Sequence, residues 1–496
     1  MQYESNIVMT RFSHFPAVLL ALCVGCSSTN DDAAGSASGG AGGSAGTGAG
    51  GTSSTAGAAG AAGYGGQPTG TGAGGPGGTG GIGGAGGAGA SVGSGGTGGV
   101  VACDVNVKTL GELNTAIGAA SAGDCICLAQ GNYGTLNLKQ VKFSAPVTVK
   151  SADRKAPATF TTARIVDTSN VTLDGLVFDY TFSASDKETV NLFSVDTSDH
   201  IVIRDSLFDG DFAKGTGTSA DGAGFGRGLS VVKSSEVALI NNEFRKWWKG
   251  FSMSTGSQYS VIGNDVHTIR SDGLNFGQVT GLLVEKNYIH DFKSAPNTAD
   301  HRDMIQILRS SGIGSSDIVI RNNIFDMAAG EYTQTIWSGT DGSSAVLKNV
   351  LVENNIVYNA HTNGIAMHSI QGIVIRKNTV LRVPRAETAK VTIPNINVGS
   401  GSTNVTMEKN VVKGIFGLNT PGWTVSGNAL VQDTDPAGPG YYDNEFIYHA
   451  KTQPDGYNEF SVKPGGTVAS LGAGSDLTKL YPLGKAATLA ALRALP

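Results

Sequence analysis

A short pattern of alternating apolar residues recurs along the chain from about residue 170 onward. Each copy ends in a charged residue or pair, an asparagine and a further apolar residue. The asparagines are Asn242, Asn264, Asn287, Asn323, Asn355, Asn378, Asn410 and Asn428, at successive intervals of 22, 23, 36, 32, 23, 32 and 18 residues. A period near 22 residues with variable additions is typical of a solenoid whose loops lengthen on one side.

The recurring asparagine has a physical explanation in such a solenoid. Equivalent turns stack about 4.8 Å apart, and a primary amide can donate to the next amide while it also bonds local backbone. Asparagine also tolerates the left-handed backbone conformation that a sharp turn needs, so we expect the asparagines themselves to adopt it. The alternating apolar residues would fill the interior, and the charged residues between them would face water.

A second set of segments with period two lies between these patterns and predicts one further strand in each coil. Its members are residues 227–231, 249–253, 272–276, 303–307, 334–338, 363–368 and 395–398. We therefore expect an all-β fold, a single-stranded right-handed parallel β-helix. Residues 109–122 have helical spacing and predict a helix that caps the first coil. A β-sandwich is the alternative, but it does not require one asparagine per repeat.

The first hundred residues predict export. Arg11 precedes an apolar run at residues 15–22 that is too short to span a bilayer. The run ends in Val24-Gly25-Cys26, which resembles a bacterial lipoprotein signal, so we expect residues 1–26 to be a signal peptide and Cys26 to be lipidated. Residues 27–100 are almost all Gly, Ala, Ser and Thr and predict a disordered linker. The β-helix domain would then occupy residues 101–496, on an outer-membrane or cell-surface lipoprotein; plain secretion is the alternative.

Charge and cysteine content limit the classes of partner and the disulfide pairings that the chain can have. The net charge is −5, and no long basic run occurs, so the composition speaks against nucleic acid as a partner. We expect a monomer that meets the membrane only through its N-terminal lipid. In an oxidising compartment Cys103 would pair with either Cys125 or Cys127, and the sequence does not choose between them.

If the second strands stack in register, their outward residues form columns that carry chemistry. One column holds Arg227, Lys249, Asp272, Asp303, Gln334 and Asn363, and the next holds Ser230, Ser252, Asn275, Gln306, Trp337, Ala366 and Asn397. Two carboxylates one coil apart repel each other unless a cation, a neighbouring lysine or a shared proton compensates. Clustered carboxylate and amide oxygens suit calcium, so we expect Asp272 and Asp303 to be candidate calcium ligands.

The segment from residue 300 to residue 309 is the richest in functional groups. His301 can move protons near neutral pH, and Arg302 or Arg309 could clamp a sugar carboxylate. Other residues are candidates for substrate binding: Trp337 by stacking on a sugar ring, and His361 and His368 by joining the same face. The alternative is that these polar groups are solvated surface residues, with Asp303 paired to Lys249 or Arg302.

Three stretches of this sequence resemble a known family. They are Asp300-His301-Arg302-Asp303-Met304-Ile305-Gln306, the segment 315–323 and the segment 363–369, followed by a Gly-rich ending at residues 463–474. They resemble secreted bacterial β-helix proteins of the pectin-lyase-like superfamily that carry H-x-D-x-I-Q in the same place. This superfamily includes polysaccharide lyases, polygalacturonases and epimerases. The paired acidic motifs of polygalacturonases and the Asp-Pro-His of mannuronan epimerases are absent.

We expect a polysaccharide partner and, as the first hypothesis, cleavage of a uronate polysaccharide by β-elimination. Calcium, Arg302 or Arg309 would neutralise the uronate, and His301 or Lys249 would take the proton. A non-catalytic module that binds glycan or forms surface structure is the second hypothesis. A glycoside hydrolase that uses Asp272 and Asp303 as paired carboxylates is the third.

Overall fold

The computed structural model describes residues 102–298, 300–309, 312–339, 345–383, 393–447, 461–483 and 485–496. The predicted signal peptide, its Cys26 and the predicted linker of residues 27–100 lie outside the described residues. Among the described residues, no helix is both long enough and apolar enough to cross a membrane.

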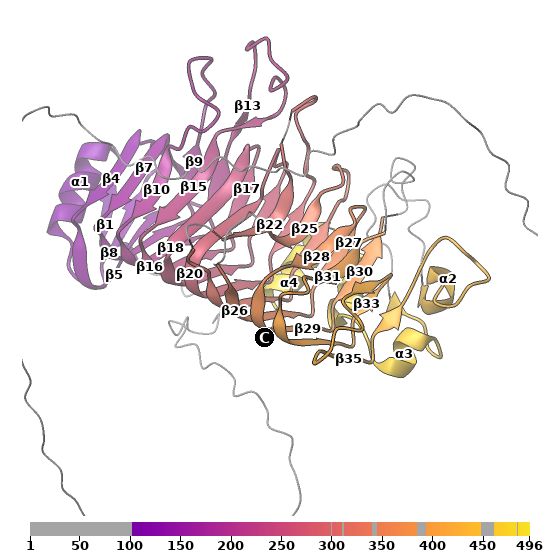
Figure 1. Ribbon diagram of the computed structural model, residues 1–496. Coiled ribbons are helices and arrows are strands. Elements are labelled where there is room, and N and C mark those ends of the chain that lie inside the picture. Colours follow the sequence, from indigo (N-terminus) through magenta and orange to yellow (C-terminus); the bar gives the residue numbers. More distant parts are fainter. Residues whose placement is uncertain are drawn as a thin grey trace, which may run out of the picture. The chain divides into compact units, whose positions relative to one another are not determined.

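The chain winds into stacked coils, each of which contributes up to three strands to three parallel sheets (Figure 1). Sheet 1 contains β4 (Thr135–Lys139), β7 (Thr162–Val166), β10 (Phe193–Asp196), β15 (Arg227–Val232), β18 (Lys249–Ile262), β20 (Leu274–Glu285), β22 (Asp303–Leu308), β25 (Gln334–Ser338), β28 (Asn363–Met367), β31 (Asn395–Val398) and β34 (Ile415–Phe416).

Sheet 2 follows sheet 1 in each coil. It contains β1 (Val105–Val107), β2 (Cys125–Leu128), β5 (Lys142–Ser151), β8 (Ser169–Asp174), β11 (Asp199–Arg204), β16 (Ser235–Ile240), β23 (Ser316–Arg321), β26 (Leu347–Glu353), β29 (Ile370–Arg376), β32 (Thr403–Glu408) and β35 (Thr424–Ser426). The long strands β18 and β20 run through both sheets and join them.

Sheet 3 completes the coil. It contains β3 (Gly131–Asn132), β6 (Ala158–Phe160), β9 (Val177–Asp179), β12 (Leu207–Asp209), β17 (Glu243–Arg245), β19 (Asp265–His267), β21 (Tyr288–His290), β24 (Ile324–Asp326), β27 (Ile356–Asn359), β30 (Thr379–Arg382), β33 (Val411–Val412) and β36 (Ala429–Leu430). Two short antiparallel pairs lie outside the coils: β13 (Asp211–Phe212) with β14 (Gly224–Phe225), and β37 (Phe446–Ile447) with β38 (Ser461–Val462). The predicted all-β right-handed parallel β-helix is confirmed.

The eight asparagines form a continuous hydrogen-bonded ladder at the turn between sheet 2 and sheet 3. Each side-chain amide donates to the amide oxygen of the next asparagine, as in Asn242 to Asn264 at 3.1 Å and Asn264 to Asn287 at 3.0 Å. Each amide also donates to a strand carbonyl, for example that of Ile203. This stacking of amides confirms the prediction drawn from the repeat.

The expected backbone conformation of the asparagines was wrong. The left-handed residue of each turn is the one before the ladder asparagine, such as Asn241 (φ 55°), Lys286 (φ 60°) and Lys377 (φ 53°). The ladder asparagine itself must keep a conformation that points its amide along the stack, so the preceding residue makes the sharp turn instead.

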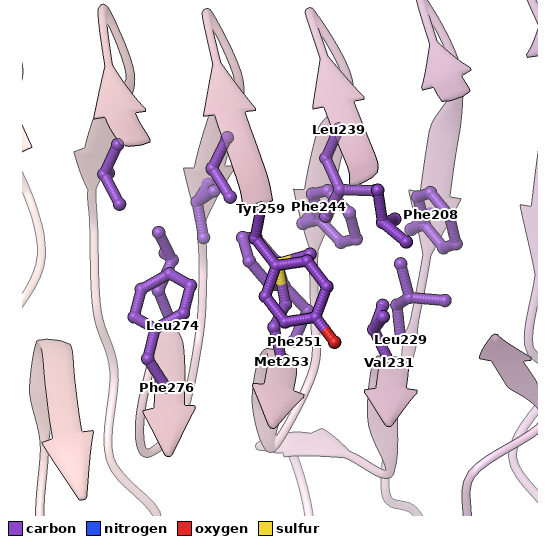
Figure 2. Packing of buried hydrophobic residues seen from close by; sticks show 14 of the residues in the cluster. Phe208, Leu229, Val231, Leu239, Phe244, Phe251, Met253, Tyr259, Leu274 and Phe276 are labelled. Carbon is purple, nitrogen blue, oxygen red and sulfur yellow. The ribbon is translucent and has the colours of Figure 1, made fainter. Parts of the chain in front are cut away.

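Apolar side chains from all three sheets fill the interior of the coils (Figure 2). Phe208 and Phe244 stack with ring centroids 4.4 Å apart, and Phe178 stacks on Phe208 at 4.5 Å. Such repeated stacks bury large apolar areas in every coil, and they explain why the alternating residues of the repeat are so often aromatic or branched.

The predicted capping helix is α1 (Leu110–Ala119), which buries Leu113, Ala116 and Ile117. Thr109 caps its N-terminus by accepting a hydrogen bond from the backbone of Glu112 at 3.2 Å. The predicted disulfide joins Cys103 to Cys127, so Cys125 is the free, buried thiol. The structure thus decides the pairing that the sequence left open.

The C-terminal segment runs back across the coils after α2 (Tyr442–Glu445). It contains α3 (Thr467–Leu471), the 3₁₀ helix η3 (Asp476–Leu483) and α4 (Lys485–Arg493). The Ser475 hydroxyl contacts Asn354, and the Arg493 guanidinium donates to the carbonyl oxygen of Gly263 at 2.7 Å. This segment therefore contacts coils that lie far apart in the sequence.

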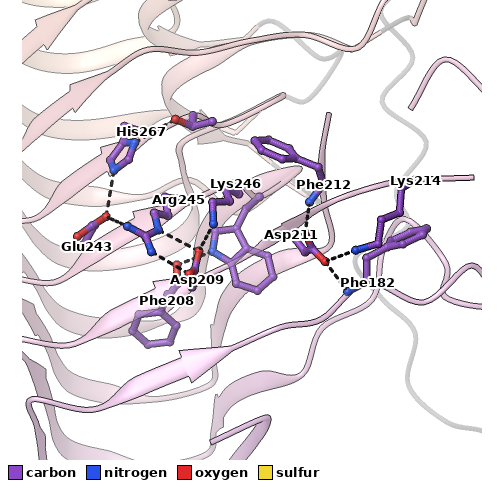
Figure 3. Close-up of polar contacts among 12 residues, drawn as sticks. Phe182, Phe208, Asp209, Asp211, Phe212, Lys214, Glu243, Arg245, Lys246 and His267 are labelled. Atoms are coloured by element: carbon purple, nitrogen blue, oxygen red, sulfur yellow. Dashed lines mark hydrogen bonds and ion pairs between the residues drawn. The ribbon is translucent and has the colours of Figure 1, made fainter. Parts of the chain in front are cut away.

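Charged side chains decorate the outer side of sheet 3 (Figure 3). Arg245 makes two hydrogen bonds to the Asp209 carboxylate, at 2.9 and 2.8 Å, and Lys246 reaches the same carboxylate at 2.9 Å. His267 contacts Glu243 at 3.2 Å. Sheet 3 thus presents paired charges, whereas long connections such as the one between β12 and β15 link sheet 3 to sheet 1.

Candidate functional site

The predicted column of polar residues stands at the start of the sheet 1 strands. The register pairs Arg227 with Lys249 and Asp303 with Gln334. Backbone hydrogen bonds from Gly250 to Asp272 and from Gly273 to Asp303 place the intermediate coils between them. The neighbouring predicted column is also confirmed, since Ser252, Asn275, Gln306, Trp337 and Ala366 are consecutive partners.

The two columns lie within hydrogen-bond distance of each other. Residues three apart in a regular strand point to opposite faces, yet the Asn275 amide donates to the Asp272 carboxylate at 3.4 Å. The backbones approach closely between the columns: a Cβ on Gly250 would lie 2.4 Å from the Gly273 carbonyl oxygen, and one on Gly273 would lie 2.7 Å from that of Met304. The close backbone packing explains the glycines at these two positions, while in the next coil Gln306 donates to Asp303 with Met304 at the equivalent position.

Two charged pairs meet in adjacent coils. The Lys249 ammonium lies 3.1 Å from the Asp272 carboxylate. His301 Nδ1 lies 2.8 Å from the Asp303 carboxylate, which also accepts a hydrogen bond from Gln306 at 3.1 Å. The predicted neighbours Lys249, Asp272 and Asp303 therefore lie together in space, and His301 joins them through Asp303.

The hydrogen bonds of His301 fix its tautomer. The Asn363 amide donates to the Gln334 side-chain oxygen, and the Gln334 amide nitrogen lies 2.5 Å from His301 Nε2. The Gln334 amide donates, so Nε2 accepts and the imidazole hydrogen lies on Nδ1, from which it bonds Asp303. A directional chain therefore runs from Asn363 to Asp303 and gives His301 the tautomer of a base held by a carboxylate.

Burial separates the two carboxylates from the two groups that reach solvent. The Asp303 side chain is 0% exposed and that of Asp272 is 4% exposed, whereas Lys249 is 24% and His301 is 41% exposed. Burial raises the pKa of the Asp303 carboxyl, and the Asp272 carboxylate raises it further. The hydrogen bond to Asp303 raises the pKa of His301. His301 and Lys249 are therefore the groups of this cluster that can touch a large substrate.

Three buried oxygens of the cluster have no hydrogen-bond partner within the described part of the chain. They belong to Asp272, Asn275 and Asp303, one oxygen each. One ligand atom from each of Asp272, His301 and Asp303 lies within 4.8 Å of the others, which is close enough for a shared cation. The residues predicted as calcium ligands therefore supply oxygens of the kind that calcium prefers.

The loop before His301 is pinned by a buried ion pair. Arg270 donates to the Asp300 carboxylate at 2.7 Å, and Trp248 donates to it at 3.2 Å. The Ser271 hydroxyl donates to the His301 carbonyl oxygen at 2.7 Å. These contacts hold the backbone of His301 against the preceding coil, so the imidazole is positioned by residues outside its own strand.

Aromatic side chains lie on the far side of His301. The Trp337 ring meets the His301 ring edge-on, with centroids 5.3 Å apart. The Arg302 guanidinium pairs with Glu331 and lies 5.2 Å from the centre of the Tyr332 ring, which stacks on His361 at 6.1 Å. Arg302 is paired with Glu331 and is 13% exposed, whereas Lys249, which is also paired, is 24% exposed, so Arg302 is the less accessible of the two to a sugar carboxylate.

Two predicted binding residues are not brought to this cluster. Arg309 is 2% exposed and donates to the carbonyl oxygen of Ala345, so no edge of its guanidinium is open to a sugar carboxylate. His368 follows the far end of β28 and lies against Gly399. Burial lowers the pKa of His368. We retain neither residue in the site, because the strand that carries each places it beyond the cluster.

Sequence reasoning missed the partners that orient the histidines. Gln334 and Asn363 stood in the predicted column, but their amides were not assigned a role. The Arg270–Asp300 pair joins two loops, and no periodic pattern signals such a contact. Position in the same column as Asp303 was the available signal for Gln334 and Asn363.

The fold defines the class of protein: this is a right-handed parallel β-helix protein. The family described as "Right handed beta helix region" matches residues 195–432. None of the curated protein sequences matches the chain.

Several solved structures are similar in fold. The Dettilon tailspike protein is 15% identical, with a TM-score of 0.44 over 65% of this chain and 62% of the tailspike, which is less than two thirds of its length. PfbA, a surface adhesin of Streptococcus pneumoniae, is 13% identical, with a TM-score of 0.39 over 65% of this chain and 87% of the adhesin. The pectate lyase Pel9A is 13% identical, with a TM-score of 0.36 over 74% of this chain and 91% of the lyase.

Proposed function

We propose that the protein is a surface-anchored enzyme that cleaves an acidic, uronate-containing polysaccharide by β-elimination on the open face of sheet 1. The observation that carries this proposal is the His301–Asp303 pair, in which a buried carboxylate orients an exposed imidazole beside the Lys249 ammonium. The pair supplies a base, and Lys249 supplies positive charge, within adjacent coils. These are the groups that elimination from a uronate requires.

The residues divide the work as follows. The uronate carboxylate binds near Lys249, which lowers the cost of placing negative charge on the sugar when the C5 proton leaves. His301 Nε2 takes that proton while Gln334 moves aside, and Asp303 stabilises the imidazolium. The C4–O bond then breaks as the C4=C5 double bond forms, and the imidazolium or water returns a proton to the leaving oxygen.

A divalent cation fits the same cluster. Asp272, Asp303 and Asn275 would hold it through the three buried oxygens that lack partners in the described chain. Bound calcium would supply additional positive charge for the uronate carboxylate. Lys249 and calcium would both supply positive charge to the uronate carboxylate. A chelator separates their contributions, because activity that survives chelation is supported by Lys249 alone.

The hydrolase hypothesis is less well supported. A nucleophilic or acid carboxylate must touch the sugar, yet Asp272 and Asp303 are nearly fully buried.

The decisive experiment incubates the full chain with alginate, pectate and glycosaminoglycans, with calcium or with a chelator. Absorbance of the unsaturated product is then followed. We expect cleavage of one of these classes, and His301→Ala should lower kcat by about 10²–10⁴-fold, as for loss of a general base. His200→Ala is the matched control, because His200 pairs with Asp199 and Glu236 on sheet 2.

Two other outcomes have defined meanings. Silence across the whole panel would refute the lyase proposal. Binding of a polysaccharide without turnover, unchanged in His301→Ala, would favour the non-catalytic glycan-binding module. The anchor is tested separately: the mature N-terminal peptide should begin at a lipidated Cys26, and Cys26→Ser should release the protein from membranes. Release without any effect of this substitution would favour plain secretion.

A further inference from the structure

We infer that Tyr332 and His361 form a sugar-binding subsite next to His301, in which His361 is a neutral hydrogen-bond donor to an uncharged sugar oxygen. The inference rests on the proposed function, since it assigns further residues to the same glycan. It adds the chemistry of the neighbouring position: an aromatic platform and an uncharged donor rather than a carboxylate clamp.

The register brings the two residues into line with His301. Asp303 pairs with Gln334, and the pairing of Ile336 with Ile365 extends to Gln334 and Asn363. His301, Tyr332 and His361 each stand two residues before one member of that column. They therefore follow one another from coil to coil, and at about 4.8 Å per coil the two histidines are roughly 10 Å apart along the axis.

A backbone hydrogen bond fixes the tautomer of His361. Its Nδ1 accepts from the backbone N–H of Asn363 at 3.1 Å. The neutral imidazole must then carry its hydrogen on Nε2. Burial lowers the pKa of His361 to about 4, and the charges of His301 and Arg302 lower it too. His361 is thus held neutral, and none of the described residues forms a hydrogen bond with its Nε2.

The two histidines consequently have opposite polarity at Nε2. In His301, Nδ1 donates to Asp303 and Nε2 accepts. In His361, Nδ1 accepts and Nε2 donates. Asn363 takes part in both arrangements. Its backbone N–H donates to His361 Nδ1, and its side-chain amide donates to Gln334, which in turn donates to His301 Nε2. The same residue therefore fixes an acceptor at one sugar position and a donor at another.

The surrounding charges select the ligand chemistry. The Arg302 guanidinium is paired with Glu331, and it covers one side of the Tyr332 ring. A sugar carboxylate at this position would meet no uncompensated positive charge from these residues. Tyr332 is 43% exposed although Arg302 lies over its ring and His361 stacks on it, so a sugar would pack on the part of the ring that these two side chains leave open. A hydroxyl or ring oxygen of that sugar then accepts from His361.

Binding is tested in full chains that carry His301→Ala to prevent turnover. Calorimetry measures the affinity for alginate and polygalacturonate hexasaccharides. Adding His361→Phe, which keeps an aromatic ring but removes the N–H, should weaken binding about fivefold, the value of one neutral hydrogen bond. His361→Gln, which retains an N–H donor, should recover most of that loss, and His200→Phe should have no effect.

The tautomer is tested without any ligand. Nitrogen-15 NMR of histidine-labelled protein at about pH 9, above the raised pKa of His301, should show His361 with its proton on Nε2 and His301 with its proton on Nδ1. A proton on Nδ1 of His361, or unchanged affinity in His361→Phe, would overturn the subsite. Failure of both hexasaccharides to bind, with the expected tautomers present, would overturn the subsite and the glycan-binding premise. Binding without cleavage by the parent chain would overturn only the lyase proposal.

Discussion

Replacing Asn323 by alanine tests the asparagine ladder at its centre. The Asn323 side chain is fully buried: its oxygen accepts from the backbone and the side chain of Asn287, and its two N–H groups share three acceptors, the carbonyl oxygens of Val284 and Arg321 and the side-chain oxygen of Asn355. The substitution leaves several buried polar groups unpaired, each of which costs about 1–3 kcal/mol, with partial relaxation. We expect a loss of about 3–5 kcal/mol in the free energy of unfolding.

Asn428→Ala is the matched control. Asn428 ends the ladder and is only half-buried; it accepts from Asn410 and donates to the carbonyl oxygen of Met407. Water can replace these bonds, so we expect a loss of about 1 kcal/mol. Urea unfolding followed by circular dichroism measures both variants against the parent. Equal losses in Asn323→Ala and Asn428→Ala would refute the idea that continuity of the buried ladder stabilises the coils.

Two further predictions concern other parts of the coil. Burial alone would lower the pKa of His290, but its hydrogen bonds to Asp265 at 2.8 Å and Asp291 at 2.6 Å raise it. The stabilisation is complete below the ordinary histidine pKa of about 6.5 and is lost as the pH rises through the raised pKa. His290→Asn should therefore lose more unfolding free energy at about pH 5.5 than at about pH 9; a larger loss at the higher pH would contradict this sign. Gly250→Ala should lower the free energy of unfolding by about 1–3 kcal/mol, because its Cβ would lie 2.4 Å from the Gly273 carbonyl oxygen; a thermally unchanged variant would show that the backbone there can move freely.

The coil could be predicted because its signals are local and repeated. One asparagine per turn and two strands of period two per coil define the stacking, and stacking alone brings Lys249, Asp272 and Asp303 together. The third strand of each coil is only two to four residues long, too short for periodicity to separate it from the turn. The third strand was therefore interpreted as the end of the repeating pattern and not as a separate strand.

Of the site residues, those in the two columns of sheet 1 could be predicted from the sequence. His301 lies two residues before Asp303, at the start of the same strand, so the sequence alone places the two side chains near each other. Arg309 is buried because it continues the alternation of Ile305 and Ile307, whose side chains point into the coil; that alternation is present in the sequence but was not applied to Arg309. The tautomers of His301 and His361 depend on Gln334 and on the backbone of Asn363, and contacts of that kind are set by loop geometry rather than by residue type.

The returning C-terminal segment changes how the stack can come apart. A simple array of repeats can fray from its last coil, one unit at a time. Here the backbone of Gly474 bonds Lys409, Ser475 bonds Asn354, and Arg493 bonds Gly263. The segment therefore links coils that do not touch one another, so the later coils should open together rather than one at a time.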